Sequence, residues 1–308
     1  MRKGSVFVVP VDLSPRTAET VSVACALAKH CEAGLHVLRI ARPRRASLLG
    51  DSPDPRLASP QAERQWSRVQ RLIQTAEVDG VQVRTAEYRG DTIDVVASYL
   101  QLTKARLLIA DQYYGSSRWR RSTTMAGNLA RAVSAPVLVV PSFRGSTGAR
   151  PVAFGHVVSA VDFTVASAIA VRTVFDLLRN SVTRLTVVHA LRNSPDRMVF
   201  SSGDAIAAAR SLPHQMAHVA DRIRQKIPAR RGVRVDMRVT TGKPDRALLE
   251  IASEVDADLI VMGVPPRSRL DEVVFGSTVR GVLRRTKRPV LLLPVAAGAY
   301  DWLEDAGA

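Results

Sequence analysis

Three consecutive residues near the C-terminal end of the chain, Gly276, Ser277 and Thr278, combine a glycine with two hydroxyls at the start of an amphipathic segment. A helix N-terminus presents N–H groups without intrahelical partners and the positive end of the helix dipole, so this arrangement suits an anion. Gly263 follows an apolar run, and a glycine at the end of a buried strand lets the backbone approach a ligand closely. The spacing predicts a phosphate site between a strand end and the next helix.

The same residues also have a purely structural interpretation. Gly263 would then be a turn, and Ser277 would cap the helix through its side chain, as serine often does. Glycine motifs match by chance often enough that spacing alone does not separate the two interpretations. Arg267 and Arg269, in the basic loop between the glycines, favour the anion.

The sequence contains no recognisable catalytic or metal-binding arrangement. Neither G-x4-G-K-[S/T] nor G-x-G-x-x-G occurs, and no Ser–His–Asp or Cys–His set can be argued. His214 and His218 are four residues apart, but no third ligand is evident. Asp271 and Glu272 lie in the basic loop, where they either hold Mg²⁺ beside a phosphate or are simply solvated; we prefer the second reading. We expect no catalytic residue and no metal ligand from the protein.

Two landmarks occur twice along the chain in the same order. Asp12 in VVPVDLS matches Asp162 in VSAVDFT at an offset of 150, and APVLVVP at 135–141 matches RPVLLLP at 288–294 at an offset of 153. Between them, the apolar run 107–110 matches 260–263. The period is too long for a solenoid and indicates a tandem duplication.

Each half alternates apolar runs with amphipathic segments, which predicts a parallel sheet with helices on both faces. Ligands bind such sheets beyond the carboxyl ends of the strands, where the winding direction reverses. In the second half the predicted strands are 156–161, 184–189, 233–239, 259–262 and 290–293, and the predicted helices are 165–179, 213–227, 244–254 and 277–285.

The duplication and the glycine spacing together resemble the universal stress proteins. Nucleotide-binding members of that family carry G-x2-G-x9-G-[S/T] between the fourth strand and the last helix. Gly263, Pro266 and the pair Gly276-Ser277 hold these positions here. Pro266 replaces the second glycine, and proline has a fixed φ and no N–H, so one backbone donor is missing.

The resemblance covers nearly the whole chain and implies an adenine nucleotide alpha hydrolase-like α/β fold. This fold has two tandem doubly wound five-stranded parallel-sheet domains, with helices on both faces, in a pseudo-two-fold arrangement. The expected divisions are a domain at 1–141, a linker at 142–154, a domain at 155–295 and a tail at 296–308. The fifth strands, 137–140 and 290–293, are expected to pair within one chain as an intrachain pseudo-dimer, and a homodimer is left open.

The resemblance also implies that the second half binds the adenine nucleotide ATP, with Mg²⁺ left open. Val161 and Asp162 would meet the adenine and ribose, and the helix start would meet the phosphates. Asp162 has an alternative role as a cap of the following helix. The expected contacts are Ala160, Val161, Asp162, Ala190, Met262, Gly263, Pro266, Gly276, Ser277, Thr278 and Val279.

The first half departs much further from the nucleotide motif. Counting back 153 residues places Ala110, Tyr113, Thr123 and Thr124 at the motif positions, so its glycines are missing. We expect this half not to bind nucleotide, although its arginine-rich loop at 118–121 leaves a smaller anion open.

Length and composition set the remaining limits. The 308 residues fit about two domains. The net charge of +16 permits attraction to nucleic acid, anionic lipid or an acidic protein, but without an aromatic stacking platform nucleic acid is not the favoured partner.

Cys25 and Cys31 form no disulfide framework, and no apolar stretch approaches the roughly 18 residues of a membrane span. The N-terminus is interpreted as a strand rather than a signal peptide, so a cytoplasmic protein without a membrane contact is expected.

The favoured function is a stress-response regulatory protein that binds ATP in its C-terminal repeat and acts on an unknown protein partner. Little or no hydrolysis is expected, because no positioned base is visible. The alternative is a nucleotide-free interaction scaffold, in which Pro266 closes the pocket and the basic surface recruits the partner. A third reading, an ATPase proper, would require turnover that depends on Ser277.

Overall fold

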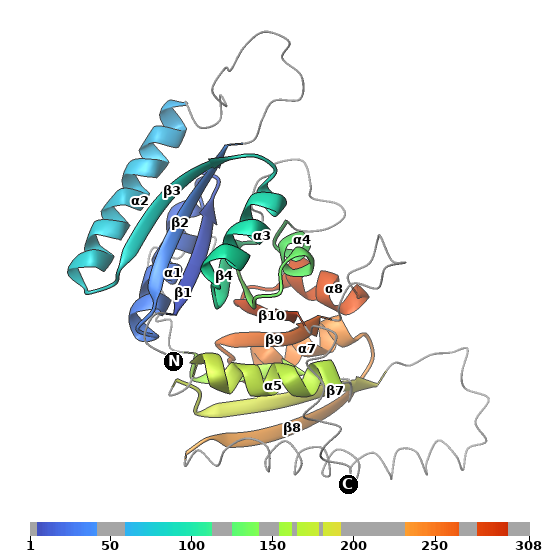
Figure 1. The fold of residues 1–308 in the computed structure, drawn as a ribbon. Coiled ribbons are helices and arrows are strands. Elements are labelled where there is room, and N and C mark those ends of the chain that lie inside the picture. The colour runs from blue at the N-terminus through green and yellow to red at the C-terminus, as the bar shows by residue number, and fades with distance from the viewer. Residues whose placement is uncertain are drawn as a thin grey trace, which may run out of the picture.

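The computed structural model describes residues 5–41, 59–112, 125–141, 154–161, 165–178, 181–191, 232–264 and 276–294. Within these residues, ten strands form one sheet in the order β3-β2-β1-β4-β5-β10-β9-β6-β7-β8 (Figure 1). All neighbouring strands are parallel except β5 and β10. Each half therefore has the strand order of a doubly wound sheet, as the sequence predicts.

The first half supplies β1 (Val6–Val11), α1 (Thr17–His30), β2 (Gly34–Ala41), α2 (Pro60–Val78), β3 (Val83–Arg89), α3 (Thr92–Thr103), β4 (Leu107–Asp111), α4 (Met125–Ala132) and β5 (Val137–Val140). The second half supplies β6 (His156–Ala160), α5 (Val165–Leu178), β7 (Arg184–Leu191), β8 (Arg234–Thr241), α7 (Pro244–Glu254), β9 (Leu259–Val264), α8 (Ser277–Arg285) and β10 (Val290–Pro294). The helix predicted at 213–227 lies outside the described residues.

Local sequence signals explain where several helices begin. Ser59 caps α2 by accepting a hydrogen bond from the Ala62 N–H at 3.1 Å, and Pro60 occupies the first helical position, where its missing N–H is no loss. Asp91 caps α3 in the same way through the N–H of Ile93 at 2.8 Å. Both helix starts can therefore be read from the sequence.

Helices cover both faces of the sheet because side chains alternate along each strand. Phe7 and Val9 of β1 belong to a buried cluster shared with α1, α2 and α5, whereas Val8 belongs to the opposite cluster with α3, α4, α7 and α8. Both clusters contain residues from both halves. The two repeats consequently share one continuous core on each face of the sheet.

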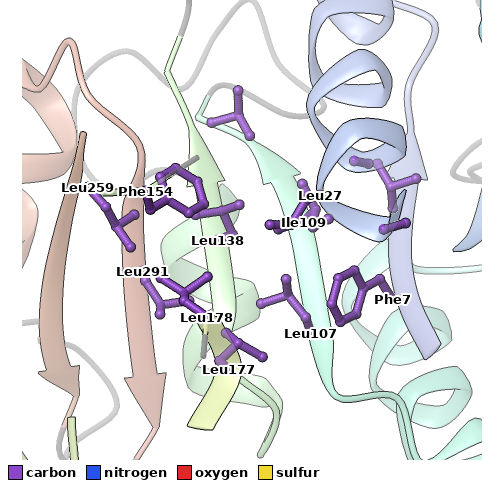
Figure 2. Packing of buried hydrophobic residues seen from close by; sticks show 14 of the residues in the cluster. Phe7, Leu27, Leu107, Ile109, Leu138, Phe154, Leu177, Leu178, Leu259 and Leu291 are labelled. Atoms are coloured by element: carbon purple, nitrogen blue, oxygen red, sulfur yellow. The ribbon is translucent and has the colours of Figure 1, made fainter. Parts of the chain in front are cut away.

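The two halves join where β5 and β10 pair in antiparallel fashion. Leu138 pairs with Leu291 at the centre, between the pairs Val137–Leu292 and Val139–Val290. Figure 2 shows Leu138 between Ile109 of the first half and Leu291 of the second. The prediction that the fifth strands pair within one chain is confirmed. The pairing covers two apolar edge strands whose backbone N–H and C=O groups would otherwise be unpaired.

The register of the sheet corrects one part of the sequence analysis. Leu108 pairs with Val137, and Ile260 pairs with Val290, so β4 and β9 correspond at an offset of 152 rather than 153. The position equivalent to Gly263 is therefore Asp111, not Ala110. In addition, β9 extends through Val264, two residues beyond the predicted strand 259–262, so the prediction that the strand stops at Gly263 is wrong.

Candidate functional site

The second half places its sequence-predicted ligand residues at the carboxyl edge of the sheet, where β6 lies between β7 and β9. Ser159 pairs with Val261 in the register that joins β6 to β9. The chain leaves β6 toward one face of the sheet and leaves β9 toward the other, because α5 and α8 belong to opposite core clusters. In doubly wound sheets, ligands bind in the crevice beyond the strand ends at such a switch point.

The end of β6 is fixed by its neighbour β7. The Val161 N–H donates to the carbonyl of Val188 at 2.9 Å, and the ring Nδ1 of His189 lies 2.7 Å from the carbonyl oxygen of Val161. Ala160 is half-buried and Val161 is 5% exposed. His189 thus holds the carbonyl of Val161, directly after β6, and helps to fix the position of this strand end.

The end of β9 is apolar, and one of its residues is a glycine without a side chain. Met262 and Val264 are 3% and 4% exposed, whereas Gly263 between them is half-buried and pairs with Leu293 of β10. Ala190, at the end of β7, is also half-buried. The strand ends therefore present small and apolar groups, which suit the face of a flat ring better than a charged ligand group.

The N-terminus of α8 lies at the same edge, since α8 connects the parallel strands β9 and β10. Gly276 is the N-cap residue, and no side chain caps the helix there. Ser277 is the first helical residue, so the interpretation of Ser277 as an ordinary N-cap is wrong. The N–H groups of Thr278 and Val279 lie in the first turn, where helix geometry provides no intrahelical acceptor.

Gly276 does not owe its identity to backbone strain. Its φ is −47° with ψ 141°, and a Cβ added there would meet nothing within 4 Å. Another residue would fit the unliganded protein equally well. A requirement for glycine at this position would have to come from a ligand placed against the helix start.

Three sets of contacts hold α8 in place along its length. Asp245 of α7 pairs with Arg285, and a Cβ on Gly281 would collide with the Asp245 side chain, so α7 and α8 pack closely. Val279, Val282 and Leu283 are buried in the core. In the last turn of the helix, the side-chain amide of Gln112 of the first half donates a hydrogen bond to the carbonyl of Leu283. Both repeats thus hold the helix that carries the candidate phosphate site.

The first half has an ion pair at the equivalent strand ends. The Nε of Arg16 lies 3.3 Å from both carboxylate oxygens of Asp111, whose side chain is only 6% exposed. At the equivalent positions the second half has Ala166, at the offset of 150, and Gly263, at the offset of 152. Asp12 also has hydrogen-bond partners within the protein: its Oδ1 accepts from the Ser14 N–H and the Thr17 hydroxyl, each at 3.0 Å.

Several predicted residues fall outside the described part of the chain. These are Asp162 and Pro266 of the candidate site, the loop arginines Arg267 and Arg269, the acidic pair Asp271 and Glu272, the histidines His214 and His218, and Tyr113, Thr123 and Thr124 of the first half. Arg16, Asp111 and Gln112 are the functional residues that sequence reasoning missed. A signal for two of them exists, because Asp111 and Gln112 directly follow the buried apolar run 107–110.

Ionisable groups elsewhere give no sign of a reactive centre in the described ranges. No three His, Cys, Asp or Glu residues there gather as metal ligands. Burial raises the pKa of Cys25 and of Cys31 to about 11, which makes both poor nucleophiles. Burial also lowers the pKa of His36 and of His156, with smaller contributions from Arg84 and Arg184. Of the helices that the structure describes, none combines the length and apolarity that crossing a bilayer requires.

Comparison with known proteins agrees with this architecture. The model of the universal stress protein family matches residues 5–141 and again 153–294. Universal stress protein MJ0577 of Methanocaldococcus jannaschii is 29% identical over 62 residues, which are 20% of this chain and 38% of that protein. The chain thus spans well under half the length of this curated relative.

Solved structures extend the similarity to the whole chain. A universal stress protein of Archaeoglobus fulgidus is 17% identical with a TM-score of 0.64, covering 95% of this chain and 97% of that one. Protein PA1789 of Pseudomonas aeruginosa is 17% identical with a TM-score of 0.60, covering 95% and 93%. A universal stress protein in complex with cAMP is 18% identical with a TM-score of 0.36, covering 45% and 97%. The first two similarities show a shared fold over nearly the full length.

Proposed function

Because the chain belongs to the universal stress protein family and contains two copies of the family's domain, we propose that it is a stress-response regulatory protein that binds ATP in its second half. The adenine would lie against the ends of β6 and β9, near Val161 and Gly263. The phosphates would lie at the start of α8, where Ser277 and Thr278 supply hydroxyls. Asp162 and Pro266, which lie outside the described residues, complete the proposed site.

The difference between the two crevices is the observation that carries this proposal. In the first half, Arg16 and Asp111 place an ion pair across the strand ends, and a purine there would have to displace it. The second half has Ala166 and Gly263 at these positions. A flat, weakly polar ring fits between small groups without desolvating a charge. The exposed start of α8 adds first-turn N–H groups that favour a phosphate.

The phosphate contacts would rely on backbone and hydroxyl donors more than on side-chain charge. The missing N–H of Pro266 removes one such donor, and the net contribution of a hydrogen bond to a charged group is about 1.5–3 kcal/mol. That loss corresponds to roughly a 10- to 150-fold weaker affinity at 1.4 kcal/mol per factor of ten. We therefore propose a regulatory nucleotide site of modest affinity. If Mg²⁺ accompanies the nucleotide, it would bind chiefly through the phosphates.

Among the described residues assigned to the proposed site, none carries a carboxylate or imidazole that could activate water, so we propose binding with little or no hydrolysis. Binding would change the surface that a protein partner meets at this edge of the sheet. This signalling role rests on the proposed nucleotide site, and its partner would be a protein rather than nucleic acid.

The test transplants the first-half ion pair into the second half. Isothermal titration with ATP would compare the wild type with the double variant Ala166→Arg/Gly263→Asp. The backbone of Gly263 is not among the described positive-φ glycines, so an aspartate is tolerated conformationally. We expect ATP affinity to fall at least tenfold in this variant.

The matched control makes the reverse change in the first half. Arg16→Ala/Asp111→Gly should leave ATP affinity within twofold, because that half is not the proposed site. Equal ATP affinity in the wild type and the second-half variant would refute the assignment. Wild-type protein that purifies without nucleotide and gives no heat with ATP would instead favour the nucleotide-free scaffold.

A further inference from the structure

A hollow of about 320 Å³ lies at the amino edge of the sheet, on the side opposite to the proposed nucleotide crevice. Its walls come from the C-terminal ends of α3 and α4 in the first half and from α5 in the second half. Most lining side chains are apolar, including Leu100, Val133 and Leu177. The volume is at the lower end of the range for small-molecule sites, which run from roughly 300 to 1,000 Å³.

Two cations stand at this hollow. Lys104 and Arg106 both line it and both are exposed. Within the described ranges of the chain, neither Lys104 nor Arg106 forms an ion pair with an acidic side chain. Unpaired charges beside an apolar hollow attract a ligand group of opposite sign, and their attraction strengthens as water is displaced.

The duplication provides an internal reference for this hollow. Lys104 corresponds to Asp256, since both follow a helix and adopt the left-handed conformation, with φ of 49° and 47°. The following residues correspond as well, because the Ala105 and Ala257 N–H groups make the same helix-ending bonds, to Leu100 and Ala252 at 3.1 and 2.9 Å. The two places therefore compare residue by residue.

The second half fills its own version of the hollow with an arginine. The Nε of Arg288 donates to the carbonyl of Ala257 at 2.6 Å, and its Nη2 lies 3.1 Å from Asp256. The Arg288 side chain is 17% exposed, so it lies largely within the structure. The first half has Ala135 at the position of Arg288. The missing side chain leaves the hollow, and the replacement of Asp256 by Lys104 reverses the charge that faces it.

We propose that this hollow binds a small apolar molecule that carries one carboxylate. The ligand's apolar body would take the place that Arg288 fills in the second half, and its carboxylate would pair with Lys104 and Arg106. A single negative charge fits better than a phosphate, because α3 and α4 both end here and helix C-termini carry partial negative charge. The lining from α5 makes the ligand a contact between the two halves.

The experiment titrates the full-length protein with sodium octanoate and follows backbone amide shifts by NMR. Octanoate should bind at millimolar or lower concentration and shift the amides of Ala105 and Ala135. The uncharged match, 1-octanol, should bind at least tenfold more weakly, and octyl phosphate should not bind more tightly than octanoate. No binding of octanoate up to 10 mM, equal binding of octanol, or tighter binding of octyl phosphate would each overturn the proposal.

Substitutions locate the binding. The double variant Lys104→Asp/Ala135→Arg recreates the Asp256–Arg288 arrangement in the first half and should weaken octanoate binding at least tenfold. Lys104→Glu changes only an exposed side chain, so it tests the charge even if the double variant fails to fold. Lys243→Glu, an equal charge change on exposed Lys243, is the matched control and should leave binding within twofold. Unchanged binding in Lys104→Glu would overturn the assignment.

Discussion

The side-chain amide of Gln112, directly after β4 in the first half, donates a hydrogen bond to the backbone carbonyl of Leu283 in α8 of the second half. This carbonyl lies in the last turn of α8, where helix geometry provides no intrahelical partner. Gln112 is 2% exposed. One repeat thereby caps the helix that carries the other repeat's candidate phosphate site.

Removing this cap should destabilise the protein without disturbing either sheet. We expect Gln112→Leu to lower the free energy of unfolding by about 1–3 kcal/mol, the usual penalty for a buried polar group left unpaired. Urea denaturation followed by circular dichroism measures the change. Gln82→Leu, on an exposed glutamine, is the matched control and should change stability by less than about 0.5 kcal/mol. Equal effects of the two substitutions would contradict the capping role.

The Arg16–Asp111 pair should contribute more than an exposed pair does. Asp111→Asn should cost about 1–3 kcal/mol, because the carboxylate is buried and its bonds to Arg16 are charge-assisted. Asp79→Asn removes the partner of Lys29 in a pair whose side chains are 55% and 45% exposed, and it should cost at most about 1 kcal/mol. Thermal or urea unfolding of both variants provides the comparison, and a larger loss in Asp79→Asn would contradict it.

Gly281 should tolerate no side chain, whereas Gly276 should. A methyl at Gly281 meets the Asp245 side chain, and the overpacking of about 1–3 kcal/mol outweighs the gain in helix propensity of up to about 1 kcal/mol. Gly276→Ser places a favoured N-cap residue in open space, so stability should be kept or slightly raised. Calorimetric melting of Gly281→Ala and Gly276→Ser distinguishes them. Equal melting temperatures would show that α7 and α8 pack less closely than described.

Acid should destabilise the protein through its buried histidines. His36 and His156 have pKa values lowered by burial, so the unfolded chain, with an ordinary histidine pKa near 6.5, binds more protons at acid pH. Their contribution to stability is therefore complete above about pH 6.5 and is lost as the pH falls below it. Each contributes at most about 1.4 kcal/mol per pH unit.

Urea unfolding at pH 7.5 and pH 5.5 measures this dependence. The double variant His36→Gln/His156→Gln should show a shallower fall in stability between the two pH values. Its stability at pH 7.5 should start lower, because two side-chain hydrogen bonds, to Tyr99 and Thr186, are altered. An unchanged slope in the double variant would assign the acid sensitivity to other groups.

The two cysteines should be almost inert in the folded protein. With a pKa of about 11, each thiol is ionised to roughly one part in a thousand at pH 8. Reaction with a chromogenic disulfide reagent should be slow in buffer and rapid in urea. Two thiols that react within seconds in the native protein would contradict the burial of Cys25 and Cys31.

The sequence was sufficient for the architecture but not for the register of one strand. The duplicated landmarks around Asp12 and Asp162 predicted two repeats, and the resemblance to the universal stress proteins predicted their doubly wound sheets and the pairing of their fifth strands. The runs LLIA and LIVM in β4 and β9 are apolar at every position, because both faces of these strands are buried. Such strands have no alternating pattern from which a one-residue shift can be detected.

The candidate site was predicted only as far as local signals reach. The helix start at Gly276 and Ser277 follows from residue types in one short stretch. The contact between Gln112 and Leu283 depends on how two distant segments meet across the β5–β10 pairing, and periodicity carries no information about that. The Arg16–Asp111 pair similarly joins residues 95 positions apart.

The two halves that pair through Leu138 and Leu291 belong to one chain, and this has an evolutionary consequence. In a symmetric homodimer every substitution appears in both subunits, so both crevices must change together. Covalent fusion of the two copies removes that constraint, and each can diverge alone. Asp111 and Gly263, or Ala135 and Arg288, show such divergence. Each ancestral position now holds a charged side chain in one copy and a small uncharged residue in the other, which allows a division of labour that identical subunits cannot achieve.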